Sequence, residues 1–268
     1  MFKLTGAARL SPPPHVAVTG ASSGLGAALA EWHARQGARL SLFGRDRVRL
    51  GQCADRCKAL GAEVAPYSCD VLDAAEMTRR LIEADDLAPV THLIANAGIG
   101  GSVALAPACG ESGDAARLLI ATNMTGLVNT LTPLLPRMVE RRDGRIGIIS
   151  SLAGYSGLPR SPAYSASKAA ARVYGEGLRR LLEPSGVSVT VVCPGFIDTP
   201  MSASLPMRRP FLVSSDKAAA QIADAMARRK AEISFPWQLA LTMQLGLWLP
   251  RPVADRLLAA SARWSARP

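Results

Sequence analysis

The sequence contains few aromatic residues and few histidines. Aromatic side chains make up 5% of the 268 residues, and only three histidines are present. The chain therefore has neither the interleaved aromatic and basic residues of many RNA- and DNA-binding proteins nor the ligand spacing of a zinc site. We expect neither a nucleic-acid partner nor a bound metal.

Cysteines are scattered and odd in number. Cys53 and Cys57 stand four residues apart, which is a helical spacing and not a C-x-x-C motif. Reduced thiols and a cytoplasmic location are therefore expected. Residues 1–14, MFKLTGAARLSPPP, lack the apolar core of a signal peptide and are interpreted as a flexible tail.

Acidic residues are outnumbered by basic ones. The sequence has 31 Lys and Arg against 21 Asp and Glu, a net charge of +10. Much of the excess comes late, because the segment from Arg228 to the end holds seven basic and two acidic residues. This charge indicates either an anionic partner, such as a membrane or substrate, or a solvated arginine-rich surface.

Hydrophobic residues make up 49% of the chain and charged residues 19%, which is typical of a protein with a large core. Apolar strand-like runs alternate with helical segments. This order predicts an α/β fold, a Rossmann-type doubly wound parallel sheet of about seven strands with helices on both faces. Ligands bind such sheets at the carboxyl ends of the strands. The predicted strands are 15–20, 38–46, 63–71, 91–98, 145–151, 187–200 and 232–235.

A glycine-rich turn joins the first predicted strand to a helix. The pattern is Thr19-Gly20-x-x-x-Gly24-x-Gly26. Glycines let the backbone approach a pyrophosphate closely, and the helix N-terminus presents free N–H groups to it. Ser22 and Ser23 add hydroxyl donors. The turn predicts a dinucleotide site.

The end of the second predicted strand indicates which dinucleotide binds. An NAD site usually carries an acid there for the ribose 2′-hydroxyl, but this chain has Gly44 followed by Arg45. A guanidinium can pair with a 2′-phosphate, so we predict NADP(H). The alternatives are that Arg45 is a solvated residue at a helix start and that Asp46 serves the ribose of NAD.

Other strand ends add candidate cofactor contacts. Asp70 and Val71 could flank an adenine ring, and Asn96–Gly98 lets the backbone approach a ribose. The sixth strand breaks at Pro194–Gly195, after which Thr199 is placed to meet a cofactor amide.

A serine, a tyrosine and a lysine have a spacing suited to proton transfer. Tyr164 and Lys168 are four residues apart in the predicted helix 162–183, so their side chains share one face. The ammonium is expected to lower the pKa of Tyr164 from about 10. Ser151 follows an apolar strand, and its hydroxyl can hold a carbonyl or alcohol oxygen. A lone Y-x-x-x-K pair is also typical of a solvated helix face.

Asn123 lies within the predicted helical segment 112–142. A buried polar side chain in mid-helix is unfavourable unless it is hydrogen-bonded. Asn123 therefore either bonds within its own helix or anchors a bound water.

Taken together, these motifs resemble the short-chain dehydrogenase/reductase family, in its soluble subgroup. The match covers about residues 15–235 and all motifs occur in family order. Ser151, and not Ser150, stands thirteen positions before the tyrosine, as in the family. The motifs are TGASSGLG (19–26), CDV (69–71), NAG (96–98), Asn123, Ser151, YSASK (164–168) and PGFIDT (194–199).

The resemblance implies a role for each catalytic residue. Tyr164 would be the general acid/base, and Lys168 would lower its pKa and bind the nicotinamide ribose. Ser151 would hold the substrate oxygen, and Asn123 would position a water in a proton relay. The implied cofactor-binding set is Gly20, Ser22, Ser23, Gly24, Leu25, Gly26, Arg45, Asp70, Val71, Asn96, Ala97, Gly98, Tyr164, Lys168, Pro194, Gly195, Ile197 and Thr199.

The expected function is an NADP(H)-dependent oxidoreductase that interconverts a carbonyl compound and an alcohol, in a homodimer or homotetramer. The alternative is a non-catalytic dinucleotide sensor or scaffold. Three loops, 99–110, 152–163 and 196–214, should line the substrate site. Their apolar residues indicate a lipophilic substrate, although such residues also pack on a core. They are Leu105, Cys109, Tyr155, Leu158, Phe196, Met201, Leu205 and Met207.

Residues 236–268 form an apolar and basic extension beyond the family match, expected to be helical and packed on the same domain. The uncharged run PWQLALTMQLGLWLP is too short to span a bilayer. The following VADRLLAASARW places Val253, Leu257, Ala260 and Trp264 on one helical face. A lid, a subunit contact and a peripheral membrane anchor all remain open.

Overall fold

The computed structural model describes residues 13–100, 105–106, 110–205 and 207–265. Seven parallel strands form one sheet in the order β11-β8-β7-β4-β1-β2-β3. The chain order reverses between the neighbours β1 and β4, which is where such a sheet opens a crevice for ligands. The strands are β1 (His15–Thr19), β2 (Arg39–Gly44), β3 (Val64–Ser68), β4 (His92–Ala95), β7 (Gly144–Ile149), β8 (Val187–Pro194) and β11 (Glu232–Phe235).

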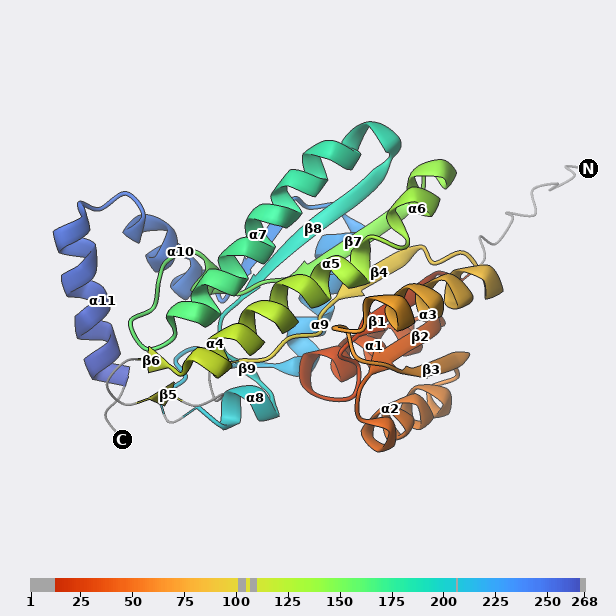
Figure 1. Ribbon diagram of the computed structural model, residues 1–268, viewed down its shortest axis with the longest axis horizontal. Helices are drawn as coiled ribbons and strands as arrows, with labels where there is room; N and C mark the ends of the chain where they lie inside the picture. The colour runs from red at the N-terminus through yellow and green to blue at the C-terminus, as the bar shows by residue number, and fades with distance from the viewer. Residues whose placement is uncertain (1–12, 101–104, 107–109, 206, 266–268) are drawn as a thin grey trace, which may run out of the picture.

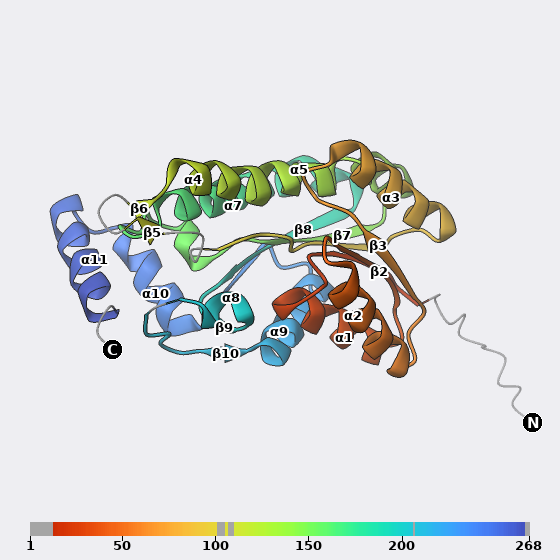
Figure 2. The ribbon, with the colours of Figure 1, turned by 60° about the horizontal axis from the view of Figure 1, so that its bottom comes forward.

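Helices cover both faces of this sheet (Figure 2). Side chains alternate along β1, so Val16 and Val18 enter one core and Ala17 the other. One layer is α1 (Gly24–Arg35), α2 (Arg47–Ala59) and α9 (Ser215–Ala227). The opposite layer contains α3 (Ala74–Leu87), α4 (Gly113–Ile120), η1 (Ala121–Thr125), α5 (Gly126–Leu131), α6 (Leu135–Arg141) and α7 (Pro162–Leu182).

Short elements gather at the carboxyl ends of the strands. They include the antiparallel pair of β5 (Leu105–Ala106) and β6 (Gly110–Glu111) and the parallel pair of β9 (Ile197–Asp198) and β10 (Val213–Ser214). Two short helices lie here, η2 (Leu152–Gly154) and α8 (Pro200–Ala203); another, η3 (Glu183–Ser185), follows α7. The sheet edge that the sequence predicted as a ligand site is therefore surrounded by connecting segments (Figure 1).

The predicted fold class is confirmed, while some boundaries differ. The third strand ends at Ser68 and not at residue 71, and the sixth ends at Pro194, with β9 as a separate element. Proline and glycine at 194–195 lack the ladder donors and side chains that a longer strand needs.

The C-terminal extension forms two helices, α10 (Trp237–Gly246) and α11 (Arg251–Ser265). Leu239, Ala240 and Met243 of α10 pack against Leu152 and Tyr155. The described side chains of α11, residues 251–260, are exposed or half-buried. Residues 1–12 of the predicted tail lie outside the described residues, and the division of the chain at 14 and 235 stays a prediction.

One helical stretch, Gly113–Arg141, is long and apolar enough to cross a bilayer by length and composition alone. It comprises α4 to α6, and its buried residues Leu127, Leu131 and Met138 belong to the core on one face of the sheet. We interpret it as a core segment of the α/β domain.

Candidate active site

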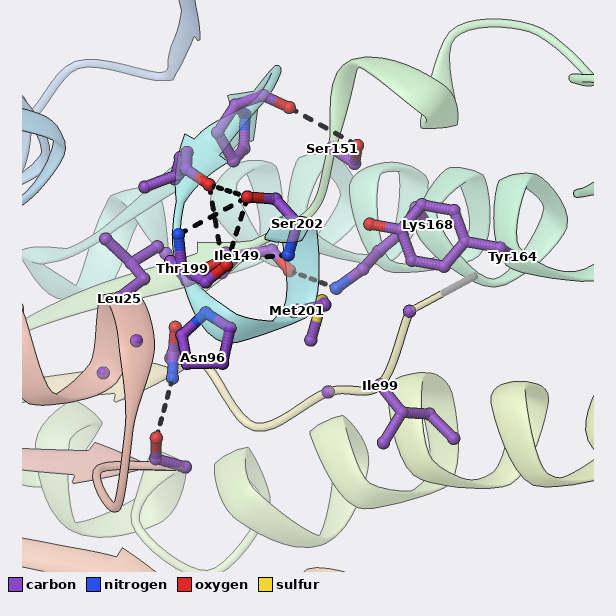
Figure 3. A pocket seen from close by; sticks show the side chains of 18 of the residues that line it. Leu25, Asn96, Ile99, Ile149, Ser151, Tyr164, Lys168, Thr199, Met201 and Ser202 are labelled. Carbon is purple, nitrogen blue, oxygen red and sulfur yellow. Dashed lines mark hydrogen bonds between the residues drawn. The ribbon is translucent and has the colours of Figure 1, made fainter. Parts of the chain in front are cut away.

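A cavity of about 750 Å³ runs along the carboxyl edge of the sheet. It brings together almost all of the residues that the sequence predicted for a site, and Figure 3 shows several of them from close by. Asn123 and Asp70 do not line it. The predicted residues that do are Gly20, Ser22, Ser23, Gly24, Leu25, Gly26, Arg45, Val71, Asn96, Ala97, Gly98, Ser151, Tyr164, Lys168, Pro194, Gly195, Ile197 and Thr199.

The glycine turn requires its glycines. A Cβ on Gly26 would lie 2.2 Å from the carbonyl oxygen of Gly20, and one on Gly20 would lie 2.9 Å from Cα of Ala97. Gly20 and Gly24 also have positive φ angles of 67° and 55°. Ser23 precedes α1 without a side-chain cap, so the first N–H groups of the helix face the cavity. This is a preformed cradle for an anion.

The ends of β1 and β4 are tied together. Thr19 Oγ1 accepts the backbone N–H groups of Asn96 and Ala97, at 3.1 and 3.2 Å, and the Asn96 amide donates to Thr19 O at 2.9 Å. These bonds hold Asn96–Gly98 against the glycine turn, which explains how the two motifs line one cavity.

Arg45 lies where β2 ends and is largely exposed beside the cavity. Its Nη1 is 3.5 Å from Oδ2 of Asp70. Asp46 instead caps α2: its carboxylate accepts the backbone N–H of Arg49 and, at 2.7 Å, its Nε. These bonds hold the pKa of Asp46 below its ordinary value. Asp46 and Arg45 both line the cavity, but the acid is engaged as a helix cap while the Arg45 side chain is 60% exposed.

Tyr164 lies in the first turn of α7, which begins at Pro162. The carboxylate of Glu111, from β6, accepts the backbone N–H groups of Ala163 and Tyr164, both at 3.1 Å. A negative charge at a helix N-terminus stabilises the helix. Glu111 therefore holds the turn that carries the phenol, a role that the sequence reading missed.

Lys168 is one turn further along α7, and Nζ donates to the carbonyl of Ile149 at 3.0 Å (Figure 3). Its Nζ is 6.0 Å from the centre of the Tyr164 ring. Ser151 follows β7; its hydroxyl accepts the N–H of Ala153 at 3.1 Å. Ser151, Tyr164 and Lys168 all line the cavity.

Asn123 lies just behind the cavity wall, in the π-helical turn η1, a conformation frequent at functional sites. Oδ1 accepts the N–H of Ile99 at 2.9 Å, and the amide donates to Ile99 O and to Ser167 Oγ. A Cβ on Gly98 would lie 3.0 Å from Asn123 Oδ1 and 3.3 Å from Lys168 Nζ. The bonds of Asn123 run across the site and not within its own helix.

Comparison with known proteins identifies the family. The family model of the short chain dehydrogenases matches residues 14–209. The chain belongs to this family. It is 40% identical, over 89% of its length and 93% of the relative's, to an uncharacterized oxidoreductase of Myxococcus xanthus. It is therefore an oxidoreductase, and the predicted family resemblance is confirmed.

Solved short-chain dehydrogenases share the fold. The actinorhodin polyketide ketoreductase, solved with NADPH, is 26% identical with a TM-score of 0.78, over 85% of this chain and 97% of that one. A Burkholderia phymatum member, solved with NAD, is 25% identical with a TM-score of 0.79, over 87% and 92%. Neighbours of this dehydrogenase thus bind either dinucleotide.

The electrostatics of the site differ from one sequence expectation. The ammonium was expected to lower the pKa of Tyr164, but burial raises it, because a phenolate loses solvation there. The Ser151 hydroxyl lowers it by less. Burial also lowers the pKa of Lys168 to about 8. The structure therefore corrects the expectation: the lost solvation of the phenolate, and not the ammonium of Lys168, decides the direction of the shift.

Thr199 was expected to meet a cofactor amide. It lines the cavity, and it also caps α8: its Oγ1 accepts the N–H of Ser202 at 3.3 Å, in a reciprocal capping box. The cap fixes the start of α8 beside the site. The amide contact stays a prediction.

Apolar side chains form part of the cavity wall. Tyr155 does not line it; the phenol of Tyr155 bonds to Glu232 and Ser234 instead. The side chains of Leu105 and Cys109 lie outside the described residues. Leu239 and Met243 of α10 do line the cavity, which the sequence did not reveal, because they lie beyond the family motifs. Of the residues predicted to line a substrate site, those that line the cavity are Leu158, Phe196, Met201, Leu205 and Met207.

Proposed function

We propose that the protein is an NADP(H)-dependent reductase or dehydrogenase that interconverts a lipophilic carbonyl compound and its alcohol. The observation that carries the proposal is a single cavity with three parts. They are the anion cradle at Gly20–Gly26, the polar group of Ser151, Tyr164 and Lys168, and a set of apolar side chains.

The described residues fit a dinucleotide. The glycine cradle and the N-terminus of α1 would hold a pyrophosphate, and the cavity volume lies within the usual range of small-molecule sites, roughly 300–1,000 Å³. Arg45 supports NADP over NAD, because its exposed guanidinium can pair with a 2′-phosphate while Asp46 is engaged as a helix cap. When bound, the nicotinamide cofactor supplies or accepts the hydride.

The protein's own residues then manage the proton. Ser151 donates a hydrogen bond to the carbonyl oxygen, which orients it toward Tyr164. Tyr164 transfers its phenolic proton to that oxygen as negative charge develops there; its raised pKa keeps it protonated at neutral pH. Below about pH 8 the ammonium of Lys168 stabilises the phenolate that remains. Asn123 holds Ile99 and Ser167 beside Lys168 and would anchor a relay water.

The apolar part of the cavity wall supports a lipophilic substrate. Five apolar side chains of the segments after η2 and β8 meet two from α10 there. Burial of apolar surface would supply most of the binding energy, and the two hydroxyl groups would provide orientation. The actinorhodin ketoreductase, by its name, reduces a polyketide carbonyl, and it is consistent with this substrate class.

Turnover tests the proposal directly. The full chain is mixed with a panel of ketones and aldehydes of increasing apolar size, and the loss of NADPH and of NADH absorbance is measured separately. We expect NADPH oxidation with the larger apolar substrates. Tight NADPH binding with no oxidation across the panel would favour the alternative, a sensor or scaffold. Homo-oligomerisation and a cytoplasmic location stay predictions.

A further inference from the structure

Helix α10 is apolar on two opposite faces and carries no charged residue. Its inner face packs on the domain. Leu239 and Met243 line the catalytic cavity, and Ala240 is buried between them and the core. This face alone accounts for the position of the helix on the protein.

The outer face of α10 exposes apolar side chains to solvent. Trp237, Leu241 and Leu245 recur at intervals of four residues, which places them on one side of α10, and Trp248 follows in the turn after the helix ends at Gly246. Trp237 is 68% exposed and Trp248 is 88% exposed. These apolar residues therefore do not serve to fill the core of the domain.

Helix α11 extends the same exposed apolar surface. Val253 and Leu257 are one turn apart, and both are exposed. Figure 1 and Figure 2 show α10 and α11 next to each other at one end of the molecule, with α11 outermost. We call the six side chains Trp237, Leu241, Leu245, Trp248, Val253 and Leu257 the C-terminal surface.

Positive charge adjoins the C-terminal surface. Residues 236–268 contain four arginines and one aspartate. Arg251 and Arg256 are exposed on α11, and neither forms an ion pair with another described residue. Tryptophans at the ends of an apolar stripe, with arginines beside it, match the chemistry of a membrane interface that contains anionic lipid.

We propose that the C-terminal surface binds the surface of an anionic lipid bilayer, with α10 and α11 lying in the plane of the interface. α10 is ten residues long, so it can lie in the interface but cannot span the bilayer. The proposal goes beyond the proposed reaction and does not depend on it. It also means that the helix in contact with lipid is a wall of the catalytic cavity.

A second copy of the chain fits this surface less well. A symmetric dimer places the same patch on both sides of the contact. The arginines at 251 and 256 of both copies would then approach each other, and Asp255 is the one acid within residues 236–268. Anionic headgroups compensate those charges, whereas a second copy doubles them.

Vesicle flotation tests the proposal with the full-length protein and no substrate. Vesicles of phosphatidylcholine alone are compared with vesicles that contain about one third phosphatidylglycerol, each at low and high salt. We expect the protein to float with the anionic vesicles, and salt to weaken the binding. Trp248→Glu should reduce the bound fraction about tenfold or more, because it removes a large apolar contact and adds a repelled charge.

The matched control is Leu181→Glu, the same type of change at an exposed apolar residue of α7. It should leave flotation unchanged. The double variant Arg251→Gln/Arg256→Gln alters no buried side chain and should weaken binding to the anionic vesicles. Protein that stays in the soluble fraction with both vesicles overturns the proposal. Flotation of the Trp248→Glu variant equal to that of the parent also overturns it. A third contrary outcome is a parent that binds no vesicles together with a Trp248→Glu variant of half the parent's light-scattering mass, because the surface would then be a contact between two copies.

Discussion

Tyr164 lies in the first turn of α7 and lines the cavity, so removal of its phenol oxygen changes chemistry more than shape. We predict that Tyr164→Phe lowers turnover of NADPH to below a few per cent of the parent, because no other described hydroxyl of α7 lines the cavity. NADPH affinity should stay nearly unchanged, since the glycine cradle and Arg45 are intact. Absorbance assays give the turnover and fluorescence titration gives the affinity.

The paired control is Tyr174→Phe, which removes the same oxygen from the same helix at a residue that does not line the cavity. It should retain normal turnover. Residual activity of Tyr164→Phe near that of this control would exclude Tyr164 as the proton donor.

We predict that Arg45 sets the preference for NADP over NAD. In Arg45→Ala the 2′-phosphate loses a charge-assisted partner and meets the unpaired carboxylate of Asp70, so KM for NADPH should rise about 10- to 100-fold. KM for NADH should change little. Arg47→Ala is the control, because Arg47 is an exposed neighbour that does not line the cavity. A parent enzyme with a lower KM for NADH than for NADPH would contradict the NADP preference.

At the scale of elements, the start of α7 depends on an acid from a distant segment. Glu111→Ala removes the carboxylate that accepts two N–H groups of α7. We predict a loss of about 1–2 kcal/mol in the free energy of unfolding, and a lower kcat because Tyr164 is less well held. For a chain of this size the melting temperature should fall by about 2–8 °C, as calorimetry would show.

A conservative variant of Glu111 distinguishes positioning of Tyr164 from a purely structural role of the acid. Glu111→Gln keeps one acceptor oxygen and should recover part of kcat. Glu176→Gln alters an exposed acid in the middle of α7 that pairs with Arg180, and it should change neither quantity. Unchanged kcat in Glu111→Ala would mean that the cap does not position the phenol.

The same elements show what the sequence could and could not predict. Runs such as VSVTVVC and the spacing of Tyr164 and Lys168 are local patterns, so the strands and α7 followed from them. The cap from Glu111 could not be predicted, because it joins residues 52 positions apart through the short strand β6. The bonds of Asn123 to Ile99 and Ser167 depend equally on how β4 and α7 meet in space. Burial also decided the pKa of Tyr164, and burial is a property of the whole fold.

On the scale of the whole molecule, the two edges of the sheet serve different purposes. The carboxyl edge holds the cavity. The three histidines gather near the opposite edge: His15 starts β1, His92 starts β4, and His33 lies near the end of α1. The rings of His33 and His92 are 6.1 Å apart. These histidines lie away from the catalytic residues, so their ionisation should affect stability before it affects chemistry.

Protonation of these buried rings should destabilise the fold. Burial lowers the pKa of His33 to about 3 and that of His92 to about 4, from 6.5 in the unfolded chain. His33 Nε2 has no hydrogen-bond partner among the described residues, so nothing compensates its charge. Between pH 6.5 and 4 the unfolded state therefore binds more protons than the native one, and stability falls as the pH falls through this window.

The expected slope is about 1.4 kcal/mol per pH unit for each histidine, measured by urea unfolding at a series of pH values. The asparagine of His92→Asn does not titrate. This variant should therefore lower the slope of the free energy of unfolding against pH by the contribution of one histidine between pH 6.5 and 4. The carboxyl of Asp85 has a pKa lowered from 3.8, so its effect belongs below this window and should persist in the variant. A slope equal to that of the parent would show that the pKa of His92 in the native protein stays near 6.5, which the desolvated position beside Arg145 opposes.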